Sequence, residues 1–149
     1  MSKTAFALLF VLPLLPAILS AGSDSTTMTV SVEVVGRTIV TIEKQPALLE
    51  ITRDDVARGY VDLPQAVSFH VRSNAANGYL LQFEPVGFPF SRADVKWGDD
   101  LARVAGEGSW IFRAYQQGTT TGTFNVRLML APQMQPGTYA WPVRFAPAS

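Results

Sequence analysis

The side chains of this 149-residue chain that could do chemistry are few and scattered. The chain has one histidine, His70, and no cysteine, which removes thiol catalysis, zinc–thiolate sites and metal centres built from several histidines. His70 shares its parity with Ser68 and Arg72, which predicts that it lies on the polar face of a strand. Because a catalytic base needs a partner and an orienting group, we predict no catalytic site, no cofactor and no enzymatic activity.

Two acidic clusters carry carboxylates of the kind that bind calcium. One is the pair Asp54 and Asp55, and the other comprises Asp94, Asp99 and Asp100. Neither cluster has the regular spacing of oxygen ligands that a calcium-binding loop needs. Aspartate is also common in turns, because its side chain bonds to nearby backbone groups. We therefore interpret both clusters as turns and predict no metal site.

Aromatic residues offer a third kind of chemistry, stacking against sugar rings. Trp97 and Trp110 are candidate glycan-stacking residues, with Phe88 and Phe90 near them in the sequence. In a small all-β domain such residues more often belong to the core, because each buries a large apolar area. Two coplanar exposed rings beside polar groups would distinguish a lectin-like binding module from a core cluster.

Composition and the start of the chain indicate where the protein works. The 12 basic and 12 acidic residues give a net charge of zero, without the basic excess that nucleic acid binding needs. Residues 1–22 combine Lys3, an apolar run and small residues at the end, which predicts a cleaved secretory signal. The run is shorter than the roughly 20 residues of a membrane span and contains Pro13 and Pro16. We therefore expect an exported mature chain without a membrane span.

After the signal, short alternating runs separated by turn residues predict an all-β sandwich. The expected strands are residues 38–42, 48–52, 60–63, 67–72, 79–84, 95–97, 110–115, 124–130 and 138–145. Asn77 and Gly78 are expected to join two of these strands in a hairpin, and Pro64 to end another. Residues 101–108 are expected to form a connector and residues 118–122 a turn. Pro142 cannot donate to a ladder, so the last strand should be bulged or partly at an edge.

One further alternating segment, residues 27–35, raises the main functional question. Its apolar residues share one parity and its polar residues the other, which is typical of a strand with one buried face: Met28, Val30, Val32 and Val34 against Thr27, Thr29, Ser31 and Glu33. No tight turn ties this segment to a neighbouring strand. It is either the first strand of its own sheet, as sequential strands often are, or a strand that packs in another copy of the protein.

Several segments resemble the spore coat protein U family, which includes the archaic chaperone–usher pilins. Pro136-Gly137-Thr138-Tyr139 and the alternation that follows are similar to that family's C-terminal strand, and residues 126–135 to the strand and loop before it. Trp97-Gly98-Asp99 resembles the family's Trp-Gly-Asp turn, and residues 67–83 occupy the place of its central hairpin. The disulfide usual in such pilins has no counterpart in this cysteine-free chain.

The resemblance implies an immunoglobulin-like, pilin-like sandwich that lacks its last strand. A periplasmic chaperone would fill the groove first, and the N-terminal extension of the next subunit would replace it at the outer-membrane usher by donor-strand exchange. Met28, Val30, Val32 and Val34 would be the partner-binding residues of that donor strand. The expected division is residues 1–22 as signal peptide, 23–36 as N-terminal extension and 37–149 as sandwich domain. The expected function is a structural subunit of a surface pilus or fimbria in cell adhesion, and the alternative is a monomeric secreted or periplasmic lectin-like module.

Overall fold

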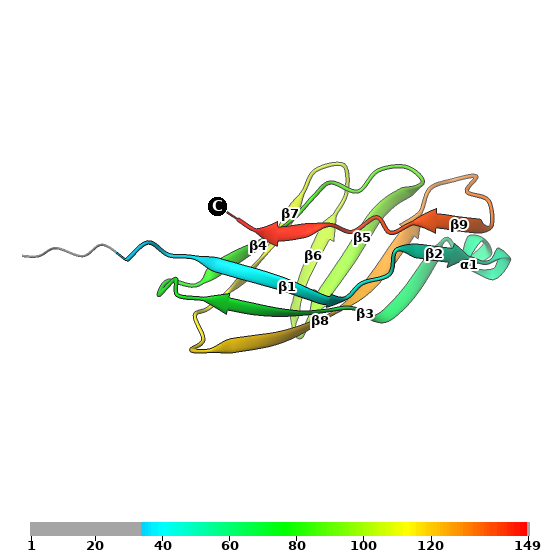
Figure 1. The fold of residues 1–149 in the computed structure, drawn as a ribbon. Helices are drawn as coiled ribbons and strands as arrows, with labels where there is room; N and C mark the ends of the chain where they lie inside the picture. Colours follow the sequence, from blue (N-terminus) through cyan, green and yellow to red (C-terminus); the bar gives the residue numbers. More distant parts are fainter. Residues whose placement is uncertain (1–33, 149) are drawn as a thin grey trace, which may run out of the picture. The chain divides into compact units, whose positions relative to one another are not determined.

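The structure is a computed structural model that describes residues 34–148 (Figure 1). The predicted signal peptide and Met28, Val30 and Val32 lie outside the described residues. The described part is mostly antiparallel β-sheet with one short helix, which confirms the all-β prediction. No helix within residues 34–148 is long and apolar enough to cross a membrane. The elements in chain order are β1 (Thr38–Lys44), β2 (Leu48–Ile51), α1 (Arg53–Arg58), β3 (Tyr60–Ser73), β4 (Tyr79–Phe83), β5 (Phe90–Trp97), β6 (Asp100–Val104), β7 (Ser109–Arg113), β8 (Thr119–Leu130), β9 (Gly137–Ala140) and β10 (Phe145–Pro147).

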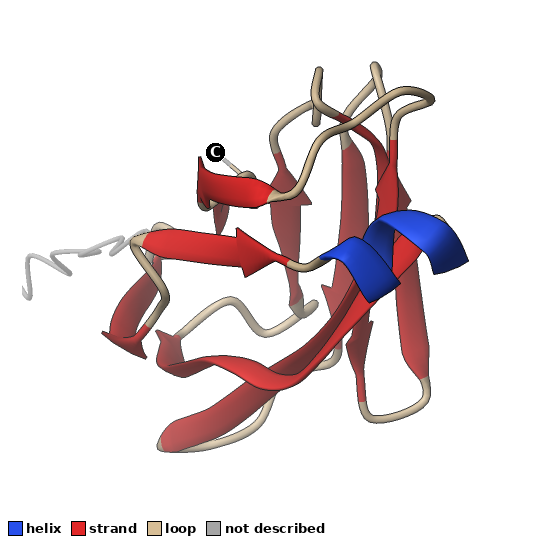
Figure 2. Ribbon diagram, turned by 90° about the vertical axis from the view of Figure 1, so that its right-hand side faces the viewer, coloured by secondary structure: helices blue, strands red, loops and turns tan. Residues whose placement is uncertain are grey.

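The strands form open antiparallel sheets that pack together (Figures 1 and 2). The large sheet has the order β1-β3-β8-β5-β6, and a three-stranded sheet has the order β10-β4-β7. A two-stranded sheet joins β2 to β9. The helix α1 follows β2 at one end of the described domain (Figure 1).

Aromatic side chains from both layers make the centre of the core. Phe69 and Phe124 of the large sheet and Phe83 of the three-stranded sheet are fully buried. The ring centroids of Phe69 and Phe124 lie 4.4 Å apart, and those of Phe83 and Phe124 lie 5.5 Å apart. The period-two alternation of β3, β4 and β8 turns these rings inward, so burial of their large apolar areas holds the layers together.

The hairpin predicted between residues 67–72 and 79–84 is wrong. In the structure β3 pairs with β1 and β8, whereas β4 pairs with β7 and β10. The two segments therefore lie in facing sheets, and the turn that ends at Gly78 carries the chain from one layer to the other. Both segments still direct their apolar residues into one core, which is why facing strands and a hairpin give the same alternation.

Four expected boundaries also differ. The strand expected at residues 95–97 begins at Phe90. The strand predicted to stop at Pro64 continues to Ser73, because a bulge between Leu63 and Val67 absorbs the proline, which has no N–H to donate. Residues 101–108 were expected as a connector, but they contain most of β6. The inward side chains of β6, Ala102 and Val104, are small. Residues 118–122 were expected as a turn, but β8 begins at Thr119. Gly122 lies inside that strand. A glycine is needed at this position because a β-carbon would meet the Phe69 ring at 2.3 Å.

The last predicted strand, residues 138–145, is divided into two. β9 pairs with β2 and β10 pairs with β4, and Pro142 lies in the gap between them. This agrees with the expectation that Pro142 would disturb the ladder. The division lets one stretch of chain serve two sheets.

Candidate functional site: an open lateral edge

The candidate site is the edge where β1 and β10 lie side by side (Figure 1). Among residues 34–148, each is the outermost strand of its sheet, so within this range β1 has a backbone partner only in β3 and β10 only in β4. Within residues 34–148, no backbone hydrogen bond joins β1 to β10. Both strands therefore keep one row of backbone groups available for another strand.

The β1 side of this edge exposes apolar side chains that point toward the core. Val40 lies opposite Val71, and Ile42 lies opposite Phe69, in the ladder with β3. Val71 and Phe69 are buried, yet Val40 is only half-buried and Ile42 is 44% exposed. An inward-facing isoleucine with this exposure indicates that the two layers do not close over it.

Phe145 is the main contribution of β10 to the same edge. Its ring centroid lies 4.9 Å from that of Phe124, 5.4 Å from that of Phe69 and 5.8 Å from that of Phe83. The side chain is only half-buried although it contacts three fully buried rings. Phe145 therefore separates the core from solvent at a place that no strand within residues 34–148 covers.

The other half of the same edge is closed. The chain leaves the large sheet near Pro46 and continues as β2, which pairs with β9 from Leu48↔Ala140 to Ile51↔Gly137. The Trp141 amide also donates to the Ala47 carbonyl at 3.1 Å. Leu49 and Ile51 are buried there. The opening is therefore confined to the stretch between β1 and β10.

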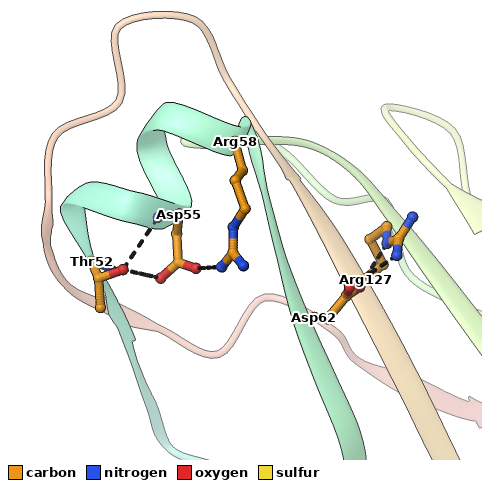
Figure 3. Close-up of polar contacts among 5 residues, drawn as sticks. All are labelled: Thr52, Asp55, Arg58, Asp62 and Arg127. Atoms are coloured by element: carbon orange, nitrogen blue, oxygen red, sulfur yellow. Dashed lines mark hydrogen bonds and ion pairs between the residues drawn. The ribbon is translucent and has the colours of Figure 1, made fainter.

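The end of β2 is fixed by the capped helix α1, drawn in Figure 3. The Thr52 hydroxyl accepts a hydrogen bond from the Asp55 amide, and the Asp55 carboxylate accepts from the Thr52 amide and hydroxyl and from Arg58. The hydrogen bonds from Thr52 hold the pKa of Asp55 below its usual value. Asp54 and Asp55, considered above for calcium, thus lie in the first turn of a helix, where negative charge is favourable.

The outer face of the large sheet is charged, and two of its ion pairs are Asp62 with Arg127 and Arg92 with Asp94. It carries a cavity of about 410 Å³ beside Asp62, Leu101 and Arg127. Two guanidinium N–H groups of Arg127 donate to the Asp62 carboxylate at 2.6 and 2.9 Å, as Figure 3 shows. The hydrogen bond from Arg127 lowers the pKa of Asp62. These partners already satisfy each other, so the arrangement fits a structural cross-strand pair.

The remaining candidate residues lie apart from one another. His70 is half-exposed, and its Nε2 lies 2.6 Å from Glu43 and its Nδ1 3.2 Å from the Thr121 hydroxyl. Asp94 pairs with Arg92 at 2.8 Å. Among residues 34–148, no group of three or more acidic or histidine side chains is close enough to hold a metal ion.

The two tryptophans proposed for sugar stacking are separated by the fold. Trp97 is 8% exposed and packs edge-on against Phe69, and the Arg113 guanidinium covers it at 3.8 Å from the ring centroid. Trp110 is 63% exposed on the outer face of the three-stranded sheet. The pair therefore does not form a shared exposed platform. Of the four donor-strand residues only Val34 is described, and it is 74% exposed.

The residues that make the open edge were not singled out from the sequence. Val40, Ile42 and Phe145 alternate as core residues do, and that pattern is the same in a covered and an uncovered strand. The distinguishing fact is the lack of a hydrogen-bonded neighbour, which depends on sheet order. Comparisons with protein-family models, curated proteins and solved structures found no match for this chain.

Proposed function

We propose that this protein is a structural subunit of a chaperone–usher type surface fibre that polymerises by donor-strand exchange. In this proposal the packed sheets are an immunoglobulin-like, pilin-like sandwich of the spore coat protein U type, without its last strand. The observation that carries the proposal is the open edge between β1 and β10, where two rows of backbone groups flank inward-facing apolar side chains. The donor is the alternating segment of residues 27–35 from another copy.

The dimensions of the donor and of the edge agree. An extended segment of nine residues spans about 30 Å at 3.3 Å per residue, and the seven residues of β1 span about 23 Å. Some Cα atoms of β1 and β10 lie within 8 Å of each other, less than the roughly 9.5 Å of two strand spacings. A donor strand would therefore pair with β1 by β-strand addition and would hydrogen-bond to β10 as well once the two strands move apart. Its apolar face would cover Val40, Ile42 and Phe145, which are the incompletely buried residues of this edge.

Burial of the donor's apolar face favours assembly. Burying Met28, Val30, Val32 and Val34 would contribute roughly 6–12 kcal/mol before ordering costs, at about 1.5–3 kcal/mol per side chain. Ordering the segment costs a comparable amount, at about 1–2 kcal/mol per residue, so the backbone hydrogen bonds of strand addition must add to the gain. A periplasmic chaperone that supplies a strand first, and an outer-membrane usher that replaces it, would protect the exposed edge during export. The protein then acts by mechanical assembly at the cell surface rather than by catalysis.

The test uses two double variants of the full chain with opposite parity. Val30→Asp with Val32→Asp places two charges on the apolar face of residues 27–35. Thr29→Asp with Ser31→Asp places the same charges on the polar face. We expect the first variant to be exported but to form no multimers, and the second to polymerise like the unmodified protein, measured by native electrophoresis and electron microscopy of surface fractions.

Two outcomes would contradict the proposal. One is that both double variants form fibres equally well. The other is that the exported, unmodified chain is a stable monomer in which residues 27–35 pair with β1 of the same molecule. That second outcome would favour the alternative, a monomeric secreted or periplasmic binding module.

A further inference from the structure

Within β4, β7 and β10, the outer face of the three-stranded sheet has no charged side chain and is rich in exposed apolar ones, and the charged Glu84 and Arg144 lie just beyond its strands. In the ladder of β4 with β7, Leu80 lies opposite Phe112 and Gln82 opposite Trp110, and all four are exposed. On the other side of β4, Ala146 lies opposite Gln82. The outer face of the large sheet, by contrast, carries charged residues such as Asp62, Lys96 and Arg127. Contiguous exposed apolar patches of this kind often mark interaction or ligand-binding sites.

A hollow of about 370 Å³ lies beside Trp110 on this face. It is lined by Leu80, Gln82, Gly108, Ser109, Trp110 and Ala148. Within residues 34–148, no hydrogen bond involves the Gln82 amide group, the Ser109 hydroxyl or the Trp110 indole N–H. Ser109 lies opposite the buried Phe83 and shares its inward face, so the hollow combines one exposed aromatic ring with two polar groups of the outer face, the Gln82 amide and the Trp110 N–H, that are not committed to other described residues.

The size of the apolar surface argues against a protein partner. The exposed parts of Leu80, Trp110 and Phe112 total on the order of 300 Å², if large side chains present about 150–250 Å² each. A stable protein interface covers about 800 Å² per partner. The hollow has instead the dimensions of a small-molecule site, for which about 300–1,000 Å³ is usual.

We propose that this hollow binds the ring of an uncharged sugar. The C–H face of the sugar would stack on the Trp110 indole, which is apolar and flat. The Gln82 amide offers both a donor and an acceptor to sugar hydroxyls, and the Trp110 indole N–H offers a donor. The absence of charge on the lining residues selects neutral sugars over acidic ones, since an acidic sugar would leave its carboxylate without a cationic partner. The site is independent of the open edge, because the edge uses the inward faces of β1 and β10.

Tryptophan fluorescence gives a direct test, because only Trp110 of the chain's three tryptophans is exposed. Trp97 and Trp141 are both buried, so a ligand-induced change in emission reports on Trp110. The probes are oligosaccharides of glucose, galactose, mannose or N-acetylglucosamine, with N-acetylneuraminic acid as the charged comparison. We expect at least one neutral sugar to change the emission in a saturable way and the acidic sugar to have no effect.

Variants of the full chain separate binding from folding and from assembly. Trp110→Ala should weaken binding of that sugar at least tenfold, measured by calorimetry, whereas Leu101→Ala should leave the affinity unchanged because Leu101 is exposed on the other sheet. Both variants should retain the circular dichroism of the unmodified protein. Trp110→Ala should also polymerise normally, so loss of fibres and loss of sugar binding have different causes.

Three results would overturn the inference. The first is that the folded protein binds none of the neutral sugars, and the second is that Trp110→Ala keeps the affinity. The third is that the emission of Trp110 changes with protein concentration in the absence of sugar. The last result would assign the face to contact between copies of the chain.

Discussion

The two lateral edges of the packed sheets are closed to different degrees. At one edge β6 and β7 are consecutive in the chain, and the loop between them joins the two layers at one end. At the other end Arg113 of β7 covers the Trp97 ring, donates to the Trp97 carbonyl at 2.9 Å and pairs with Asp100 of β6 at 3.2 Å. At the opposite edge β1 and β10 are neighbours without a covalent connection, and no backbone hydrogen bond joins them within the described chain.

This difference indicates that closing such a fold needs a bridge between the layers as well as an apolar core. Both edges have buried aromatic residues beneath them, Trp97 at one and Phe69 at the other. Among residues 34–148, only the first edge also has a side chain that reaches across to satisfy backbone and charged groups of the facing sheet. The second edge combines incompletely buried apolar side chains with backbone groups that no other strand of residues 34–148 pairs, which is the combination that strand addition uses.

The largest effect is expected from removing the aromatic support of the closed edge. Trp97→Ala deletes a buried ring in contact with Phe69 and Phe124, and should lower the free energy of unfolding by about 3–5 kcal/mol. Phe112→Ala is the control, an aromatic residue that is exposed on the outer face, and should cost less than about 1 kcal/mol. Urea unfolding followed by circular dichroism measures both. Equal losses would mean that Trp97 does not belong to the core.

A smaller loss is expected from removing the bridge itself. Arg113→Ala should cost about 1–3 kcal/mol, because it removes a partly desolvated cation–π contact and a hydrogen bond from a charged donor. Arg113→Lys should recover only part of this, since an ammonium group cannot stack on the ring and bond to both Trp97 and Asp100 in the same way.

The control for the bridge is Arg103→Ala, also on the β6 side. Arg103 is exposed and has no ion pair among residues 34–148, so its loss should change stability by less than about 0.5 kcal/mol in the same urea experiment. A loss as large as that of Arg113→Ala would show that net charge, and not the bridge, sets the effect.

Alternation alone was enough to predict most strands and most of the core. Val67, Phe69, Tyr79 and Leu81 are buried as their parity requires, although the sheets they belong to were assigned wrongly. Parity states which side chains face inward, but it carries no information about which strand lies alongside. β6 was missed for a different reason. Its inward residues, Ala102 and Val104, are small and give a weak apolar pattern.

The open edge could not be predicted for the same reason. Ile42 and Phe145 have the apolar character of core residues, and their exposure arises only because the chain divides into β9 and β10 and passes from β1 to β2. Trp97 and Trp110 differ because Trp97 shares the inward face of β5 with Val95, whereas Trp110 lies on the opposite face of β7 from the buried Ile111. Arg113 gave no signal, because a bridging arginine and a solvated arginine look alike in sequence.

Two isoleucines of β1 make a sharper test of the open edge. Ile42 and Ile39 lie on opposite faces of the strand and are 44% and 46% exposed. In a chain that lacks residues 27–35, replacing either with alanine should cost about 1 kcal/mol or less. Addition of a synthetic peptide of residues 27–35 should raise the melting temperature, because a ligand that binds only the folded state stabilises it.

The two variants should differ in their response to that peptide. Ile42→Ala should reduce the rise in melting temperature, because the donor strand would pack on Ile42, and Ile39→Ala should leave the rise unchanged because Ile39 faces outward. Differential scanning fluorimetry at several peptide concentrations measures the response. An equal response of the two variants, or no rise in either, would contradict insertion of a strand at this edge.

The smallest expected effect concerns the closed half of the β1/β10 edge. Thr52→Ala removes the N-cap of α1, which should lower the free energy of unfolding by about 1 kcal/mol. The loss should be the same with and without the peptide, because the β2/β9 pairing is already complete.

The lowered pKa of Asp55 also makes this half sensitive to acid. A carboxyl group with a folded-state pKa below its unfolded value stabilises the protein above the unfolded value, and this contribution is lost as the pH falls through the folded value. The urea midpoint should fall from neutral pH to about pH 3 in both proteins, and the fall should be smaller in Asp55→Asn than in the unmodified protein. Asp62, whose pKa Arg127 lowers, should contribute to the fall in both proteins. An identical fall in the two proteins would mean that the cap contributes nothing to acid sensitivity.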